Sequence, residues 1–180
     1  MKDHKDSFPN NPKCRLINPS KSELGKVSKG ILSKIIHVVR EKTKFNHWKN
    51  SDSVIKWFTN LEEKQRSSFI QFDIKEFYPS IRKDLLIQAL NFASKYIKIT
   101  AEERQIILQC RNSILFNEDK PWIKKGNSQF DVTMGSLDGA EICELVGLYL
   151  LSQLSDLGIT VGLYRDDGLC AVKLSPRQTE

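Results

Sequence analysis

Two apolar, strand-like segments of this 180-residue chain end in aspartate, and this pattern narrows the possible folds more than any other. The first covers residues 69–74 and carries Asp73, and the second is a β-hairpin predicted for residues 160–172 with Asp166 and Asp167 at its tip. Aspartate is unfavourable inside strands, and adjacent aspartates repel, so a positive group is expected beside them. Mg²⁺ meets this need because it prefers a few carboxylate oxygens and accepts substrate phosphates as further ligands.

Each acidic segment also has a simpler interpretation when taken alone. Asp166-Asp167-Gly168 can be only a tight hairpin turn, since Asp-Gly is among the commonest turn pairs, and Asp73 can be an ordinary residue at a strand end. The same arrangement nevertheless occurs twice, in Phe-Asp-Ile-Lys-Glu-Phe-Tyr at 72–78 and in Tyr-Arg-Asp-Asp-Gly at 164–168. The repetition favours a two-metal site that stabilises the attacking and leaving oxygens of a phosphoryl transfer.

The rest of the chain predicts helices around these strands, which places the protein in the α+β class. Apolar spacing predicts a basic amphipathic helix after Gly25 and a helix from about Ser53, and Thr100 with Glu103 forms a capping box for another. Further helices are expected over 85–93 and 140–154, a short strand over 14–18, a loop over 42–50 and short strands joined by turns over 116–133. Residues 69–74 are expected to form a buried strand.

Composition excludes several classes of protein. The formal net charge of +6 favours contact with phosphate backbones, and a hydrophobic content of 39% suits one globular domain. The charged N-terminus and the absence of a long apolar run predict a soluble intracellular protein of the nucleus or cytoplasm, not a membrane protein. The cysteines lack metal-ligand spacing and are expected to be buried thiols, namely Cys14, Cys110, Cys143 and Cys170.

Four motifs together resemble the reverse transcriptases of retroelements. The Asp73 segment is similar to the first catalytic motif of that family, and Tyr164–Asp167 is similar to its Tyr-x-Asp-Asp hairpin. Between them, Thr133–Ser136 before an apolar helix resembles the segment that supports template and nucleotide. Near the start, Arg15–Pro19 followed by Ser28-Lys29 resembles the fingers segment that holds the triphosphate. The four motifs occur in the order found in the family.

The resemblance implies a right-hand polymerase, with a palm whose antiparallel sheet packs on helices, and with partial fingers. Residues 1–67 would be fingers and residues 68–180 a palm truncated before the thumb. The implied activity is RNA-directed DNA synthesis, in which dNTPs are added to a primer 3′-hydroxyl on an RNA or DNA template. The alternative is a catalytically inactive nucleic-acid-binding remnant or a co-opted domain. The sequence indicates no particular oligomeric state.

The resemblance also assigns roles to individual residues. Two Mg²⁺ ions, or Mn²⁺ in their place, would be held by Asp73, Asp166, Asp167 and the backbone carbonyl of Ile74. The nucleotide would contact Arg15, Lys13, Tyr78 and Gly135. Independently of the resemblance, Lys124 and Lys125 are candidates to follow the template backbone and Trp122 to stack on a base, although a solvated hairpin is the favoured interpretation of this segment.

Several residues depart from the family pattern or carry no clear role. Arg165 is large and charged at the variable place of the hairpin, where it would either neutralise the neighbouring carboxylates or point toward a primer phosphate. Glu141 and Glu144 share one helix face, and pairing with a nearby Lys or Arg is favoured over a second acidic site. Ordinary packing is the favoured interpretation for His47 and Trp48.

Overall fold

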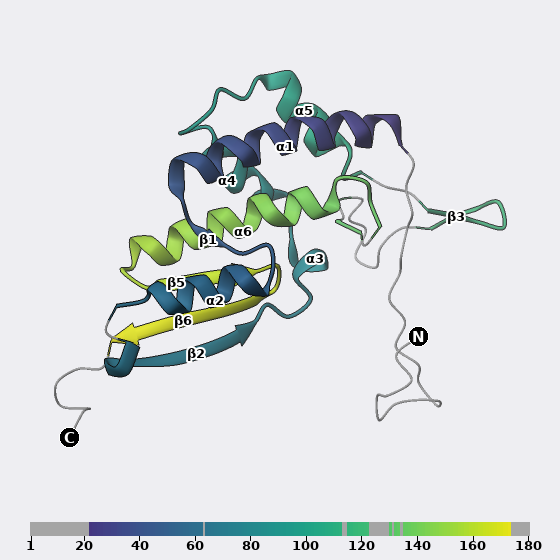
Figure 1. Ribbon diagram of the computed structural model, residues 1–180. Coiled ribbons are helices and arrows are strands. Elements are labelled where there is room, and N and C mark those ends of the chain that lie inside the picture. The colour runs from purple at the N-terminus through teal and green to yellow at the C-terminus, as the bar shows by residue number, and fades with distance from the viewer. Residues whose placement is uncertain are drawn as a thin grey trace, which may run out of the picture.

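A four-stranded sheet with helices stacked on one face forms the body of the protein in the computed structural model (Figure 1). The structure describes residues 22–62, 64–112, 115–122, 130, 132–133 and 135–173. Helix α6 (Gly139–Asp156) lies directly on the sheet, and α1 (Glu23–Thr43), α4 (Lys83–Ala93) and α5 (Ala101–Gln109) lie beyond it. This mixture of helices and sheet agrees with the α+β class.

The strand order of the sheet is β1-β5-β6-β2. The hairpin expected over 160–172 is present as β5 (Thr160–Tyr164) and β6 (Asp167–Lys173), and β6 also pairs antiparallel with β2 (Ser67–Asp73). The short β1 (Asn46–His47) instead runs parallel to β5. The sheet is therefore antiparallel only in part, and β1 lies in a segment expected to be a loop.

The remaining elements connect these layers, and the first of them packs against the face of the sheet that α6 does not cover. They are α2 (Ser51–Asn60), the 3₁₀ turn η1 (Lys64–Arg66), the single-turn α3 (Phe77–Ser80), and the hairpin of β3 (Leu115–Asn117) with β4 (Lys120–Trp122). The capping box at α5 is confirmed, because Thr100 Oγ1 accepts from the Glu103 amide and the Glu103 carboxylate accepts from the Thr100 amide. Each such cap contributes about 1 kcal/mol to helix stability.

The main hydrophobic core lies between the helices and brings together the two halves of the chain. Leu32 of α1, Leu86 and Leu90 of α4, and Ile142 and Leu145 of α6 are all fully buried in it. A smaller cluster lies between α6 and the sheet, formed by Leu151, Val161, Leu163 and Cys170. Burial of each large apolar side chain stabilises the fold by about 1.5–3 kcal/mol. The helical layer therefore holds the sheet from one side.

Charged side chains cross the interface between α1 and α6. Lys29 Nζ lies 3.4 Å from Glu141 Oε1, and Arg40 Nε lies 2.7 Å from Glu144 Oε1. These contacts confirm that the two glutamates pair with basic residues. Both pairs join α1 to α6.

A buried polar trio lies at the beginning of α6. Asp138 accepts a hydrogen bond from Ser28 Oγ at 2.5 Å and forms an ion pair with Arg111, which follows α5. Ser28 is 0%, Asp138 1% and Arg111 2% exposed, so the charges of the pair are withdrawn from water. Although aspartate is a favoured N-cap residue, the Asp138 carboxylate does not cap α6. The trio instead ties α1, the end of α5 and the start of α6 together.

Strand β2 corrects one expectation from the sequence. It forms where the apolar pattern predicts it, but it is an edge strand and not a buried one. Phe69 is 38% and Ile70 54% exposed, on opposite faces of the sheet. An apolar run indicates a strand but does not distinguish a central strand from an edge strand.

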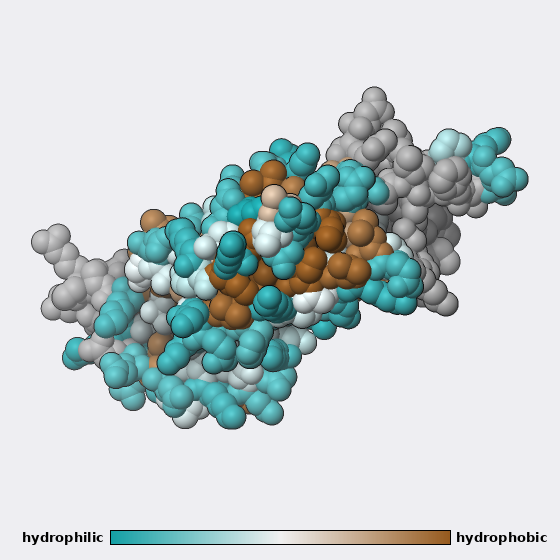
Figure 2. Space-filling model, turned by 90° about the horizontal axis from the view of Figure 1, so that it is seen from above, coloured by the Kyte–Doolittle hydropathy of each residue, from teal (hydrophilic) through white to brown (hydrophobic). Residues whose placement is uncertain are grey.

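The outer surface of the helical layer is not uniformly polar. Seen from above, apolar residues gather in the middle of this face and hydrophilic ones surround them (Figure 2). Leu24 and Val27 of α1 contribute exposed apolar surface, since they are 40% and 50% exposed. No helix among the described residues is long and apolar enough to cross a membrane.

Candidate active site

The acidic residues predicted from the sequence meet at one end of the sheet. Asp73, the last residue of β2, lies directly opposite Asp167, the first residue of β6, and Asp167 in turn lies opposite Tyr164 of β5. Residues directly opposite one another in a sheet project from the same face. The Ile74 amide also donates to the backbone oxygen of Asp166 at 2.8 Å. Segments about 90 residues apart in the sequence are thus joined by backbone pairing.

The turn that carries Asp166 is tighter than the sequence indicates. Tyr164 pairs with Asp167, so that only Arg165 and Asp166 form the connection between β5 and β6. The tight hairpin turn that the simpler interpretation expects at Asp166-Asp167-Gly168 is present, but its central residues are Arg165 and Asp166, because Asp167 and Gly168 belong to β6. Gly168 lies opposite Phe72, and a Cβ atom at this position would overlap the Phe72 ring. The glycine is required by packing within the sheet.

The carboxylate groups at this end of the sheet are accessible to solvent. Asp73, Asp166 and Asp167 are all exposed. Directly opposed residues of an antiparallel pair have Cα atoms about 4.5–5.5 Å apart, so rotation of the side chains can bring the Asp73 and Asp167 carboxylates to one cation. In the arrangement seen here, no three His, Cys, Asp or Glu side chains of the described segments converge closely enough to hold a metal ion. As an all-oxygen donor set, these carboxylates suit Mg²⁺.

Tyr78 lies beside the acidic turn. It is in α3, four residues after Ile74, with its neighbour Phe77 buried in the core at 4% exposure. Partial burial raises the pKa of the Tyr78 phenol, and the nearby Cys143 thiol and Asp166 carboxylate raise it further, while Arg165 opposes them. Burial raises the pKa of the Cys143 thiol to about 12. The phenol is therefore neutral and held between α6 and the acidic turn.

A pair of tryptophans borders the site on the face that carries Asp73 and Asp167. Trp48 covers Gly162, the position next to Tyr164 on the same face of β5, where a Cβ atom would overlap the indole. Trp57 of α2 packs against Trp48 with ring centroids 5.2 Å apart. Trp48 is only 7% exposed, which agrees with the packing role expected from the sequence. The glycine in the middle of an apolar strand marks this close approach of another group.

His47 faces the other way, toward α6. Its Nδ1 lies 2.8 Å from Arg40 Nη2, and its Nε2 lies against Gly147, where a Cβ atom would come within 2.7 Å. Burial, together with the charge of Arg40, lowers the pKa of His47 to about 4. The ring is therefore neutral at ordinary pH, and its packing role agrees with the expectation from sequence.

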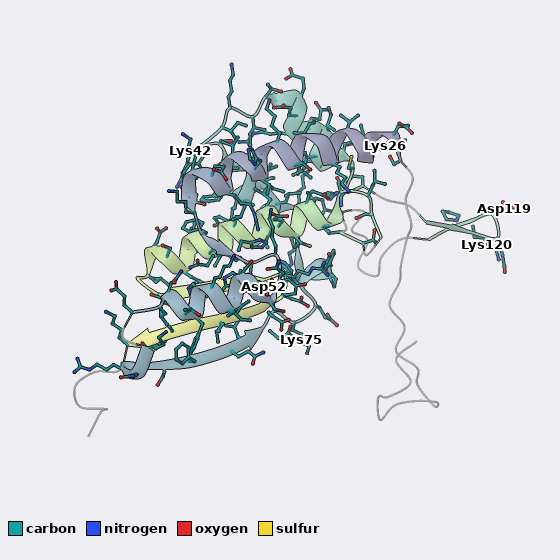
Figure 3. All side chains as sticks on the ribbon, viewed as in Figure 1. Lys26, Lys42, Asp52, Lys75, Asp119 and Lys120 are labelled. Carbon is teal, nitrogen blue, oxygen red and sulfur yellow. The ribbon has the colours of Figure 1, made fainter. Side chains whose placement is uncertain are left out.

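The other predicted contact residues are placed only in part. Gly135 is exposed, has φ +89°, and belongs to a turn in which the Ser136 amide and hydroxyl both donate to the Thr133 carbonyl. Trp122 ends β4, and the β3–β4 hairpin, whose tip carries Asp119 and Lys120, projects from the body (Figures 1 and 3). The expected strand 14–18 and the candidates Lys13, Arg15, Lys124 and Lys125 lie outside the described residues.

No protein-family model matches the chain, and no curated protein matches it.

Proposed function

We propose that this protein is the catalytic core of a reverse transcriptase, which adds dNTPs to a primer 3′-hydroxyl along an RNA template. The single observation that carries the proposal is the register that sets Asp73 opposite Asp167, with the Ile74 amide bonded to the Asp166 carbonyl. Two distant motifs, each weak alone, would then supply carboxylates to one site. The motif order in the sequence supports the same assignment.

The proposed chemistry relies on position and charge. The primer 3′-oxygen would attack the α-phosphorus of the dNTP, the bond to pyrophosphate would break, and the hydroxyl proton would leave to solvent. Two Mg²⁺ ions, when bound, would supply activation of the 3′-hydroxyl and charge stabilisation of the pyrophosphate. Asp73, Asp166 and Asp167 would hold and orient these ions with their carboxylates. No side-chain nucleophile is required.

The surroundings of the carboxylates support a site for a nucleotide sugar. Tyr78 presents a half-buried aromatic ring near Asp166, and the ring packs against the core that contains Phe77 and Cys143. A ring fixed in this way would lie under the incoming sugar and crowd a 2′-hydroxyl, which would favour deoxynucleotides. Helix α1, which belongs to the proposed fingers, shares one core with α4 and α6 of the proposed palm.

Primer extension tests the proposal directly. The chain is incubated with an RNA template, a DNA primer, dNTPs and Mg²⁺, and product is measured by gel electrophoresis. Asp166→Asn should lower the extension rate by about a hundredfold or more, because even indirect partners of metal ligands are worth 10–100-fold. Asp84→Asn, which changes an exposed aspartate on α4, is the matched control and should extend at the rate of the unchanged protein.

A metal titration separates the two functional alternatives. Mg²⁺ binding measured by calorimetry should weaken in Asp166→Asn. If the unchanged protein makes no product and Asp166→Asn binds Mg²⁺ as well as the unchanged protein does, the catalytic proposal fails. If the protein then binds a primer–template with an affinity that falls as salt is raised, but incorporates no dNTP, it is a nucleic-acid-binding domain without polymerase activity.

A further inference from the structure

Arg165 has an unusual backbone conformation for its residue type. Its φ is +57°, in the left-handed region, and it is the first of the two residues in the β5–β6 turn. A side chain other than glycine costs about 1 kcal/mol or more in this conformation. Glycine or asparagine would satisfy the turn at lower cost. The position therefore carries a large cation at some expense to the local fold.

The guanidinium group lies on an aromatic ring and not on the carboxylates beside it. The Arg165 Cζ atom is 5.7 Å from the centroid of the Tyr164 ring, a cation–π arrangement worth about 0.5–1 kcal/mol at an exposed site. No ion pair joins Arg165 to Asp166, to Asp167 or to any other carboxylate of the described segments. The Arg165 side chain is therefore placed by the ring of its neighbour and not by a salt bridge to the carboxylates.

The position of Arg165 leaves its positive charge available to a ligand at the acidic end of the sheet. Tyr164 lies opposite Asp167, and so on the face of the sheet that carries Asp73 and Asp167. Arg165 is exposed, and its charge reaches the phenol of Tyr78. A guanidinium supported by a ring presents its planar set of N–H donors outward, which matches two oxygens of a phosphate. The carboxylates alone would repel such an anion.

We propose that Arg165 binds a phosphate group at the acidic end of the sheet, supplied either by the backbone of a bound nucleic acid or by the triphosphate of a nucleotide. This inference rests on the proposed polymerase function, because it identifies part of the substrate site. The ligand chemistry is the same for both sources, and binding measurements distinguish them.

The nucleic-acid source is tested without catalysis. A fluorescent RNA–DNA primer–template is titrated with protein, without dNTP, over a range of salt concentrations, and anisotropy is recorded. If the phosphate belongs to nucleic acid, Arg165→Ala should weaken binding about tenfold and reduce the salt slope by about 1. The matched control is Lys75→Ala, which removes one exposed positive charge in the turn that follows β2 (Figure 3).

The nucleotide source is tested with inorganic tripolyphosphate, whose binding is measured by calorimetry in the presence of Mg²⁺. If the phosphate belongs to the nucleotide, Arg165→Ala should weaken tripolyphosphate binding about tenfold and raise the KM for dNTP, while primer–template affinity stays unchanged. Arg165→Lys should recover only part of the loss, because lysine keeps the charge but lacks the planar pair of donors.

The outcomes separate this inference from the proposed function. If Arg165→Ala and Lys75→Ala have equal effects on both probes, the Arg165 charge acts only as part of the general positive field, and the inference is overturned. If the unchanged protein does not extend primers but loses phosphate binding specifically in Arg165→Ala, the polymerase function fails and the phosphate site stands. If the unchanged protein extends primers and Arg165→Ala has no specific effect on phosphate binding, the polymerase function stands and the phosphate site fails.

Discussion

The beginning of α6 and the acidic end of the sheet both contain charged residues, but the charges are buried and paired in the first region and exposed in the second. At the beginning of α6, Asp138 is buried and fully matched by Arg111 and Ser28. At the end of the sheet, Asp73 and Asp167 face each other, exposed and without a basic partner among the described residues. The first arrangement fixes elements in place, and the second leaves charge available for a ligand.

This difference separates acidic residues that stabilise the fold from acidic residues that are available to bind a ligand. A buried carboxylate with two partners is already satisfied and serves the fold. Like charges directly opposite on adjacent strands destabilise a sheet, and they persist where something outside the protein compensates. By this criterion Asp138, although close to a predicted motif, is structural, while Asp73 and Asp167 are the better candidates for function.

The largest effect should come from breaking the buried trio. Arg111→Met should lower the free energy of unfolding by about 3–5 kcal/mol, because it leaves Asp138 charged and unpaired in the core. Urea denaturation measures the change. Asp73→Asn, at the exposed end, should not destabilise the protein, and a loss of similar size there would remove the distinction between the two regions.

A double replacement checks that the loss arises from the unpaired charge. In Arg111→Met combined with Asp138→Leu, neither charge remains, and most of the lost stability should return. A double variant as unstable as the sum of the single variants would show that the trio contributes through packing and not through its charges.

Acid should destabilise the protein through His47, which packs against α6. Its pKa is about 4 in the folded protein and 6.5 in an unfolded chain, so the unfolded state takes up a proton first as pH falls. The stability due to neutral His47 is complete above pH 6.5, and about 3 kcal/mol should be lost between pH 7 and pH 4. Thermal melts at several pH values measure this loss.

Comparison of two histidine variants isolates this contribution. His47→Gln should flatten the part of the stability profile between pH 6.5 and pH 4. His37→Gln, which changes an exposed histidine on α1, should leave the profile unchanged. Equal profiles for both variants would contradict a role for His47 in acid sensitivity.

The smallest effect concerns repulsion within the acidic end. Without divalent cations, Asp73→Asn should raise the free energy of unfolding by about 0.5 kcal/mol, because it removes one of two opposed like charges. Mg²⁺ at ten times its dissociation constant should reverse the order by stabilising only the unchanged protein, by about 1.4 kcal/mol. Melting temperatures with and without Mg²⁺ measure both changes, and equal responses of the two proteins to Mg²⁺ would count against a site at Asp73.

Local patterns made much of the fold predictable. The capping residues of α5, the apolar stripe of α6 and the β5–β6 hairpin were located from residue type and spacing alone. The proximity of Asp73 and Asp167 was expected from a resemblance to a family, and the pairing of β2 with β6 places the two residues directly opposite each other. Pairing of Glu141 and Glu144 with basic residues was also foreseen.

What the sequence did not predict depends on contacts between distant residues. Nothing local distinguishes β2 as an edge strand, since its apolar residues suit either position. Asp138 and Arg111 lie 27 residues apart, and their pairing requires the packing of α1, α5 and α6. The turn was expected at Asp166-Asp167-Gly168, but its central residues are Arg165 and Asp166, because the pairing of Asp167 with Asp73 and Tyr164 places Asp167 and Gly168 in β6.

The open edge of β2 has a practical consequence for work with the purified protein. Along residues 68–71 every side chain is exposed, and one side of the backbone has no neighbouring strand among the described residues. Such an edge is a template on which other polypeptides can align, and two of its residues are apolar. Concentrated samples should therefore form β-rich aggregates sooner than dilute ones, and a lysine at position 70 should delay them.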